Sequence, residues 1–323
     1  MFFIRYRAWI LLLAALLLSF AVSRMSDQFN SYYLDIILTA GISIVLAVSL
    51  NLVNGHTGQF SLGHAGLMAV GAYGSAVVSL QLGPQLQHIF GTGEFGQGLA
   101  FLTALLTGGI MAALFGWMIG VPSLRLRGDY LAIVTLGFNE IIRVLLQNTK
   151  PDGTFGGALG LSGIPDHSTV FWVFGSAALC IYTVTCMVNS TWGRGFLAVR
   201  DDEVAASSMG ISTTRYKVTA FVVGAFFAGI GGGLYAHQKG AINPEGFNFL
   251  KSFDVVVIVI LGGMGSTVGV IAAAIILTVL NEYLRDFEQY RMIIFSLLLI
   301  IMMLVRPQGL LPATLFEKKG RTA

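Results

Sequence analysis

Ser61 lies three residues before His64 in a short polar stretch, and a serine near a histidine raises the possibility of hydrolysis. A hydrolase would pair Ser61 with His64 or His237 as the base, and would place an oxyanion hole beside the serine. Its nucleophile would sit in a G-x-S-x-G turn, whereas residues 59–63 read QFSLG and lack the first glycine. We therefore predict that the chain is not an enzyme.

His56 and His64 also raise the question of a metal site. They stand eight residues apart across a glycine-broken turn, with no cluster of Cys or carboxylate residues beside them. This is a poor ligand set for zinc. Cys180 and Cys186 are six residues apart in one apolar run, so on a helix they do not face each other. We expect hydrogen-bonded structural histidines, packed thiols, and no cofactor or metal bound by this chain.

The polar stretch is more informative as a glycine-broken interruption between two long apolar runs. Residues 54–64 read NGHTGQFSLGH, and residues 261–269 form a second interruption, LGGMGSTVG. Irregular backbone at membrane depth is tolerated only where it is buried in protein or lines a wet cavity. Paired breaks in two halves of a hydrophobic chain point to a transport path. The sequence thus predicts a permease whose substrate path follows Gly55, Gly58, Ser61, Gly63, Gly262, Gly263, Gly265 and Ser266.

These residues also have a purely structural interpretation. The glycines of both breaks would permit tight helix packing without touching a substrate. The hydroxyls in the breaks would line the path, or would only satisfy backbone groups that the breaks release. They belong to Thr57, Ser61, Ser266 and Thr267. Both interpretations remain open at the level of sequence.

The composition indicates what must position the two breaks. Of 323 residues, 55% are hydrophobic and only 11% are charged, against about 25% charged in soluble domains. A net charge of +3 is too small to suggest a nucleic-acid partner. We predict an all-α polytopic transmembrane bundle of about 8–10 membrane segments, surrounded by lipid, with a re-entrant or broken pair. Residues 1–323 would form one permease domain.

Runs of about 20 apolar residues mark the candidate spans. They are residues 8–22, 34–53, 63–82, 99–119, 130–146, 170–188, 218–236, 253–280 and 292–305. A cleaved signal peptide is the alternative for the first run, but further spans follow and Arg24 comes close behind it. Small residues at four-residue spacing predict close helix packing at Gly108, Ala112, Gly116 and Gly120, and at Gly229 and Gly233.

Orientation follows from Lys and Arg in the short loops. With the N-terminus in the cytoplasm, most basic residues fall on the inside. The C-terminus, with Lys318, Lys319 and Arg321, is also cytoplasmic if residues 253–280 enter and leave on one side. Each arm of that segment is too short for a crossing of about 20 residues. We therefore favour a re-entrant pair over one long kinked crossing.

Two further features of the spans concern charge and loops. Glu140 and Arg143 are three residues apart inside the fifth span, on one helix face. Ionisable residues at this depth are functional candidates, but we favour a mutually neutralising intramembrane ion pair that fixes helix packing. The external loops 83–98 and 147–169 would meet an external partner or serve as simple connections.

Residues 189–217 form the longest cytoplasmic connection. Asp201 can cap a helix, Asp202 and Glu203 suit its positive N-terminal end, and Ala205 and Ala206 favour helix. Gly210 is a natural stop. We predict a short helix over residues 201–209, which needs a surface to pack on because it is too short to be stable alone. That surface is either the inner face of the same protein or a cytoplasmic partner.

A partner becomes the sharper expectation because no G-x-x-x-x-G-K-S/T phosphate loop occurs in the sequence. If ATP drives transport, another subunit must hydrolyse it. Glu203, Ala205, Ala206 and Gly210 resemble the E-A-A-x-x-x-G loop by which permeases of ABC importers couple to their ATPase.

Longer motifs make the resemblance specific. Residues 51–65, NLVNGHTGQFSLGHA, resemble the signature of branched-chain amino acid ABC permeases. Residues 124–143, LRLRGDYLAIVTLGFNEIIR, resemble a hallmark of the LivM-type permease of that family, and residues 193–206 and 306–310 fit the same pattern. The matches cover most of residues 45–312. The external loop over residues 153–165 departs from the family pattern.

The resemblance implies a bacterial inner-membrane importer with several subunits. Its expected partners are a LivH-like permease, two ATP-binding subunits and an external substrate-binding protein. It also implies the substrates leucine, isoleucine and valine, whereas related permeases carry urea or short amides. Arg200, Asp201, Glu203, Ala205, Ala206 and Gly210 would couple the permease to the ATPase. An ion-coupled carrier is the remaining rival.

Overall fold

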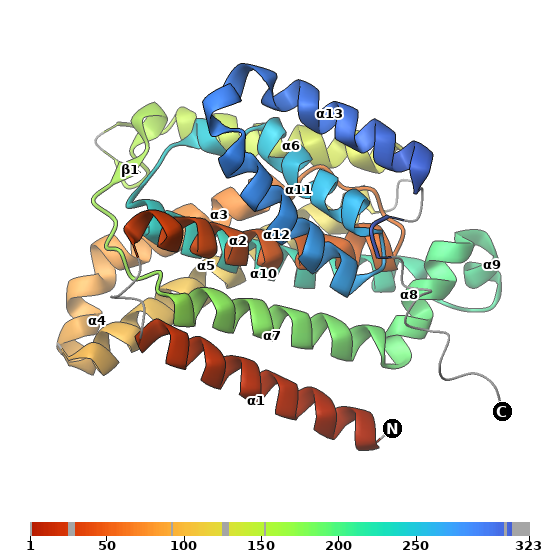
Figure 1. Ribbon diagram of the computed structural model, residues 1–323, viewed down its shortest axis with the longest axis horizontal. Helices are drawn as coiled ribbons and strands as arrows, with labels where there is room; N and C mark the ends of the chain where they lie inside the picture. The colour runs from red at the N-terminus through yellow and green to blue at the C-terminus, as the bar shows by residue number, and fades with distance from the viewer. Residues whose placement is uncertain are drawn as a thin grey trace.

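The computed structural model describes residues 2–24, 30–91, 93–124, 129–151, 153–306 and 309–311. Its long helices run roughly along the long axis of the molecule (Figure 1). They are α1 (Phe2–Arg24), α2 (Ser31–Asn51), α3 (His64–Val77), α5 (Glu94–Ser123), α6 (Asp129–Gln147), α7 (Val170–Val188), α10 (Thr213–Lys239), α11 (Phe249–Gly262), α12 (Thr267–Tyr283) and α13 (Glu288–Val305).

Short elements connect these helices. The helical ones are α4 (Gly83–Phe90), α8 (Thr191–Asp201), α9 (Glu203–Ser208), the π-helical turns η2 (Leu52–His56) and η3 (Val78–Leu82), and the 3-10 turns η4 (Gly157–Leu159), η5 (Pro244–Phe247) and η6 (Arg285–Phe287). Two two-residue strands, β1 (Leu161–Ser162) and β2 (Ala241–Ile242), pair antiparallel. Neither α4 nor the strands were among the predicted elements: α4 and β1 lie within the predicted external loops, and β2 follows the predicted span over residues 218–236.

Six helices in the described part of the chain are long and apolar enough to cross a membrane. They are Ser31–His56, His64–Leu86, Glu94–Ser123, Tyr130–Gln147, Val170–Val188 and Thr213–Lys239, and each covers a predicted span. Leu12–Arg24 and Thr267–Tyr283 are shorter apolar helices. The predicted class, an all-α polytopic bundle, is confirmed. The total of about 8–10 segments stays a prediction.

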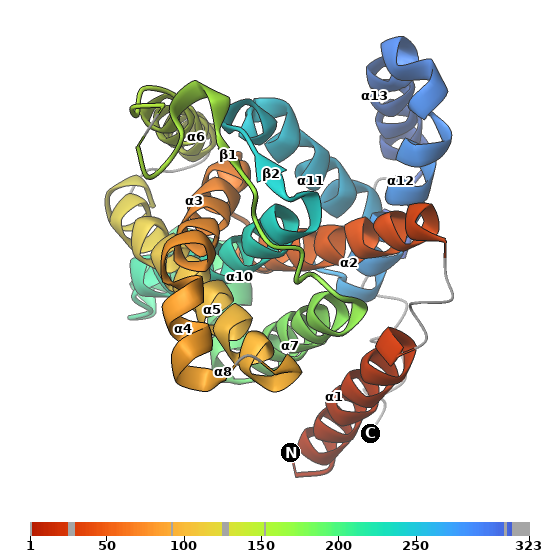
Figure 2. The same cartoon turned by 90° about the vertical axis from the view of Figure 1, so that its left-hand side faces the viewer.

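Helix α10 forms the centre of the bundle, and α2, α3 and α5 pack around it (Figure 2). The packing is close because small residues meet at the crossings: a Cβ on Gly71 would collide with the backbone of Gly229, and one on Gly108 would lie 2.6 Å from the Gly71 carbonyl oxygen. Without a side chain at these crossings the helix backbones can approach. Both predicted small-residue stripes therefore lie at helix crossings.

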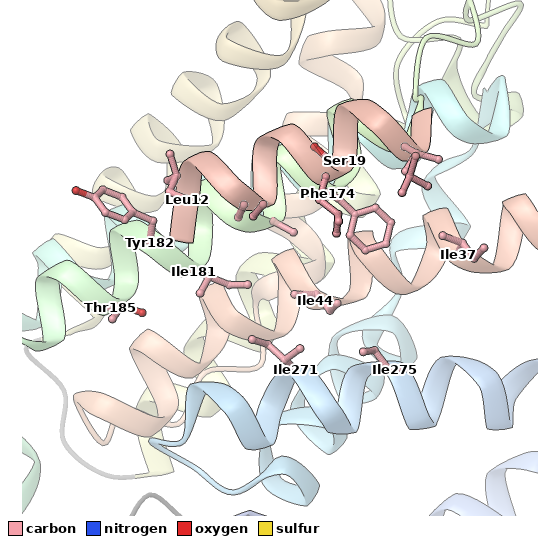
Figure 3. A pocket seen from close by; sticks show the side chains of 16 residues that line it. Leu12, Ser19, Ile37, Ile44, Phe174, Ile181, Tyr182, Thr185, Ile271 and Ile275 are labelled. Carbon is pink, nitrogen blue, oxygen red and sulfur yellow. The ribbon is translucent and has the colours of Figure 1, made fainter. Parts of the chain in front are cut away.

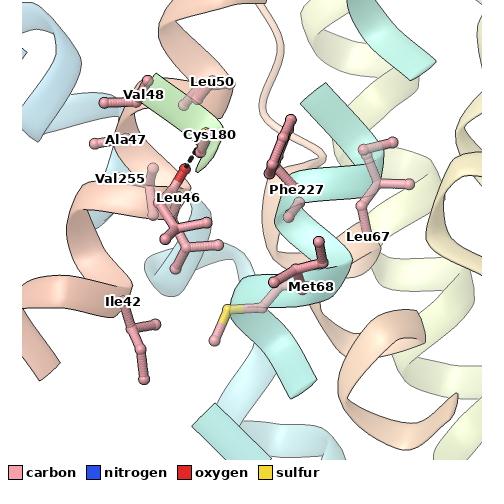
Figure 4. Close-up of a cluster of buried hydrophobic side chains, with 14 of the residues drawn as sticks. Ile42, Leu46, Ala47, Val48, Leu50, Leu67, Met68, Cys180, Phe227 and Val255 are labelled. Atoms are coloured by element: carbon pink, nitrogen blue, oxygen red, sulfur yellow. Dashed lines mark hydrogen bonds between the residues drawn. The ribbon is translucent and has the colours of Figure 1, made fainter. Parts of the chain in front are cut away.

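Apolar side chains fill the space between these helices. Figure 4 shows Leu46 and Val48 of α2, Met68 of α3 and Phe227 of α10 in one buried cluster. Cys180 of α7 joins them, with its Sγ 3.8 Å from the Val45 carbonyl oxygen. Cys180 is buried, Cys186 is half-buried, and neither forms a disulfide.

Helices α11 and α12 form a hairpin rather than one kinked crossing. Lys251 near the start of α11, Glu282 near the end of α12 and Asp35 near the start of α2 line one cavity, so both arms return to the same end of the bundle. The prediction of a broken pair is confirmed. The start of α1 and the end of α13 lie at the opposite end, where α8 and α9 also lie (Figure 1). Lys318, Lys319 and Arg321 fall outside the described residues.

Candidate functional site

The first break follows α2 through one π-helical turn, Leu52–His56, and continues irregularly to the start of α3. Side chains satisfy part of the released backbone. Asn54 Oδ1 accepts a hydrogen bond from the Ser61 amide at 3.2 Å, and Thr57 Oγ1 donates to the Val53 carbonyl at 2.7 Å. Gly58 has φ +69°, a left-handed conformation that favours glycine.

The second break separates α11 from α12 over residues 263–266. Gly263 and Gly265 have φ values of +103° and +86°. Ser266 caps α12, because its side chain accepts a hydrogen bond from the Gly269 amide at 3.2 Å. Gly262 packs against Val270 and Gly269 inside the hairpin, so its lack of a side chain serves helix packing.

The two breaks lie in direct contact, although they are far apart in the sequence. The Gly265 amide donates to Asn51 Oδ1 at 2.9 Å. A Cβ on Gly55 would collide with the Gly265 amide nitrogen. The structure thus brings Gly55 and Gly265 together. Whether a substrate passes between the breaks stays a prediction.

Gly63 and Ser61 lie on a different side of the first break, next to α6. A Cβ on Gly63 would lie 2.7 Å from the Thr135 carbonyl oxygen, and the Leu62 amide donates to Thr135 Oγ1 at 3.0 Å. The Ser61 hydroxyl accepts from the Gly63 amide at 3.4 Å. Thr135 is a contact that sequence reasoning missed.

Buried polar atoms without a protein partner gather at the first break. They are Asn51 Nδ2, His56 Nε2 and both side-chain amide atoms of Gln59. Burying such atoms costs free energy unless water or a polar solute satisfies them. Asn51 and Gln59 were not among the predicted path residues. The available signals were a polar side chain inside an apolar run for Asn51 and a place within the polar break for Gln59.

The histidines differ from one another. His64 Nε2 lies 2.9 Å from the Ser49 hydroxyl, so His64 is a hydrogen-bonded structural histidine as predicted. His237, for which no structural role was predicted, has its Nε2 2.7 Å from the Ser79 hydroxyl. For His56 the prediction is not confirmed, because its buried Nε2 has no hydrogen-bond partner among the described residues. No group of three or more potential metal ligands occurs among the described residues.

Arg200, near the end of α8, touches both breaks. Its Nη1 donates to the Gly55 carbonyl at 3.4 Å. A Cβ on Gly58 would lie 2.8 Å from Arg200 Cγ, and one on Gly265 would lie 3.4 Å from Arg200 Nη1. Residues 309–311 also lie next to the second break, because the Leu310 amide donates a hydrogen bond to the Leu261 carbonyl at 2.9 Å.

The predicted coupling helix is shorter than expected and begins later. Asp202, not Asp201, caps it: Asp202 Oδ1 accepts from the amides of Val204 and Ala205 at 2.8 and 3.0 Å. Asp201 instead ends α8 and pairs with Arg200 at 3.4 Å. The extended backbone of Asp202 separates the two helices. Gly210, just past the helix, has φ +81° and provides the predicted stop.

Helix α9 has an anchored side and an open side. Glu203 Oε1 lies 2.6 Å from Lys217 Nζ of α10, and Ala206 is buried. Val204, Ala205, Ser207 and Met209 are exposed, Met209 to 83%. Of the two expected packing surfaces, the one on the protein itself is therefore present, and the exposed Val204 and Met209 leave an apolar surface for a partner.

Glu140 and Arg143 form the predicted ion pair in α6. Arg143 Nε and Nη2 both lie 2.8 Å from Glu140 Oε2. The side chain of Glu140 is 34% exposed and that of Arg143 is 25% exposed. The pair borders a cavity of about 310 Å³ together with Glu245 and Asn248. Its role in the protein stays a prediction.

A further cavity among the described residues lies elsewhere and is apolar. Figure 3 shows this groove of about 610 Å³, with Leu12 of α1, Ile44 of α2, Phe174 of α7 and Ile271 of α12 among its walls. The Ser19 hydroxyl in its wall already donates to the Leu16 carbonyl at 2.8 Å. Such walls offer little to the charged groups of an amino acid.

Comparison with known proteins points the same way as the motifs. Residues 32–305 match the family model described as branched-chain amino acid transport system / permease component. The chain is 39% identical to the high-affinity branched-chain amino acid transport system permease protein LivM of Escherichia coli (strain K12), over 87% of this chain and 70% of the relative. It is 38% identical to LivM of Salmonella typhimurium, over 94% and 74%.

More distant relatives include a second permease type. The chain is 26% identical to the permease protein LivH of Escherichia coli (strain K12), over 91% of this chain and 100% of the relative. No solved structure matches the chain significantly.

Proposed function

Because the chain belongs to the family of permease components of branched-chain amino acid transport systems, we propose that it is the LivM-type permease of an ATP-driven importer. Its substrates are leucine, isoleucine and valine, the class named for its relatives. It works beside a LivH-like permease, two ATP-binding subunits and an external substrate-binding protein. The chain itself binds no cofactor, and ATP is used by the partner subunits.

The contact of Arg200 with both breaks is the observation that carries the coupling mechanism. Arg200 lies two residues before Asp202, which caps α9. An ATP-binding subunit that grips the exposed side of α9 therefore acts on a segment already in contact with Gly55 and Gly265. Movement of α8 and α9 separates or closes the breaks, and the path opens alternately to each side.

The path binds its substrate weakly, because a tightly bound solute would not leave. Selectivity is supplied by the external binding protein. At the breaks, Asn51 Nδ2 and the side-chain amide of Gln59 supply partnerless polar groups for a passing ammonium or carboxylate.

The end of the bundle that holds α8 and α9 faces the cytoplasm, in the bacterial inner membrane. Both chain termini are then cytoplasmic. This orientation places most Lys and Arg of the short loops inside, as membrane insertion favours.

Uptake into vesicles that contain the full complex tests this function. With ATP inside and binding protein outside, labelled leucine should accumulate, and labelled urea should not. Uptake of urea but not of leucine would assign the chain to the amide-carrying branch. Leucine uptake driven by an ion gradient, without any ATP-binding subunit, would make the chain a carrier and overturn the proposal.

A further inference from the structure

A polar crevice enters the bundle at the end opposite to the breaks. Helices α2, α11 and α12 form its walls, and it encloses about 120 Å³, enough for several water molecules. Asp35, Thr39 and Ser43 line it from α2, Asp254 from α11 and Thr278 from α12. Ionisable side chains such as Asp35 and Asp254 are unusual between the helices of a membrane bundle and are functional candidates there.

The spacing of the α2 residues shows how deep the crevice reaches. Asp35, Thr39 and Ser43 follow at intervals of four, so they share one face of the helix. Leu46, three residues further, ends the lining. From residue 35 to residue 46 the helix rises by about 16 Å, roughly half the hydrocarbon thickness of a bilayer. The polar lining on α2 ends at Ser43, about 12 Å along the helix from Asp35, and the apolar Leu46 lies just beyond it.

Positively and negatively charged side chains both lie at the mouth of the crevice. Lys239 Nζ lies 3.0 Å from both carboxylate oxygens of Asp35, and Gln238 Nε2 donates to Asp35 Oδ1 at 2.8 Å. On the α12 side, Glu282 accepts from Arg285 at 3.1 Å. A solute with one ammonium and one carboxylate group can exchange partners with such pairs, whereas a neutral amide gains less from them.

The bottom of the crevice is closed by apolar side chains. Leu46, Val255 and Ile258 are all at least nine-tenths buried. Beyond the seal lie Asn51 at the end of α2 and Gly265 in the break after α11, whose hydrogen bond joins the two breaks. Asn51 is fully buried, and its Nδ2 has no partner. The crevice and the breaks therefore occupy the two ends of one seam between α2 and the α11–α12 hairpin.

We propose that this crevice is the outer half of the substrate path and receives a zwitterionic amino acid with a small apolar side chain. The proposal deepens the proposed function and rests on it for the substrate. The ammonium group meets Asp35 and Asp254, and the apolar side chain meets the seal formed by Leu46, Val255 and Ile258. Passage requires α2 to part from the hairpin, which opens the seal toward Asn51.

Accessibility of single cysteines tests the crevice without relying on transport. In the assembled complex, with the native cysteines replaced, Ser43→Cys should react with a membrane-impermeant, ammonium-bearing thiol reagent added outside. The matched control is Thr183→Cys, which lies on α7 and lines none of the cavities described above. We expect Ser43→Cys to react about tenfold faster or more, the scale on which a charged cleft concentrates a cation. Equal rates at the two positions would overturn the crevice.

Two further measurements, of reagent preference and of leucine uptake, distinguish a failure of the crevice proposal from a failure of the proposed function. Asp35→Asn should remove most of the preference of Ser43→Cys for the cationic over an anionic reagent, whereas Asp166→Asn in an exposed loop should not. Labelled Ser43→Cys should no longer take up leucine. If labelling is complete but ATP-driven leucine uptake is unchanged, the proposed function stands and the crevice is not the path. If labelling blocks uptake of urea in a complex that never carries leucine, the crevice stands and the substrate is wrong.

Discussion

Lys217 Nζ lies 2.6 Å from Glu203 Oε1, and this ion pair joins the short helix α9 to the long helix α10. The Lys217 side chain is only 7% exposed. At the other end of α10, Lys239 pairs with Asp35 of α2 at 3.0 Å. Ion pairs therefore attach α10 to the predicted coupling helix at one end of the bundle and to the mouth of the polar crevice at the other.

Reversing the charge of Glu203 should uncouple ATP hydrolysis from transport. In Glu203→Lys two ammonium groups would face each other. We expect a cost of about 1–2 kcal/mol, which is below the cost of breaking a fully buried ion pair because the Glu203 side chain is partly exposed. We expect ATPase activity to persist while leucine uptake in vesicles falls, with normal insertion. The double variant Glu203→Lys/Lys217→Glu should recover part of the uptake. Normal uptake in Glu203→Lys would contradict the coupling role.

The end of α9 offers a second test of coupling. Gly210 has φ +81°, which proline cannot adopt because its ring holds φ near −65°. Gly210→Pro should uncouple the ATPase from uptake, through backbone strain of about 1–3 kcal/mol. Asparagine tolerates this conformation better than other residues with side chains, so Gly210→Asn should keep most of its uptake. Equal loss in both variants would mean that the conformation of Gly210 is not what matters.

Gly58 tests the path at the first break. A valine there would have to adopt φ +69° and would press against Arg200 Cγ, 2.8 Å from its Cβ. Gly58→Val should block leucine uptake while the complex still assembles. Gly83→Val is the matched control because nothing lies within 4 Å of its Cβ, and its uptake should stay within about twofold, as for surface substitutions. Unchanged uptake in Gly58→Val would remove Gly58 from the path.

Variants of the Glu140–Arg143 ion pair in α6 distinguish a role in helix packing from a role in transport. Arg143→Met would leave the Glu140 carboxylate unpaired inside a span, where one charge costs about 2.5–3.5 kcal/mol. We expect reduced insertion, measured as the yield of folded protein in the membrane. Glu140→Gln/Arg143→Met removes both charges and should restore the yield and uptake. If the double variant inserts normally but does not transport, the pair belongs to the path instead.

The spans and the hairpin could be predicted because each depends on a local property of the chain. Runs of about 20 apolar residues defined the spans, and two arms too short to cross alone defined the hairpin. The π-helical turn at Leu52–His56 has no such signal. Helix α4 had one, since Pro84 near its start and apolar residues at helical spacing favour helix.

The candidate site could be predicted only in part, because its contacts are long-range. Arg200 and Gly55 are 145 residues apart, and no local pattern places them together. The cap of α9 was misplaced by one residue, since Asp201 and Asp202 are chemically equal candidates and only the preceding helix α8 decides between them. The polar face of α2 was hidden in a run that reads as an ordinary apolar span.

Cross-linking from α9 tests the central claim, that a nucleotide-hydrolysing subunit grips this helix. Ala205 and Ser207 are exposed and Ala206 is buried against the protein itself, which makes Ala206→Cys the matched control. In the native assembly, Ala205→Cys and Ser207→Cys should cross-link to an ATP-binding subunit and Ala206→Cys should not. If neither exposed position reaches such a subunit, the coupling account is wrong.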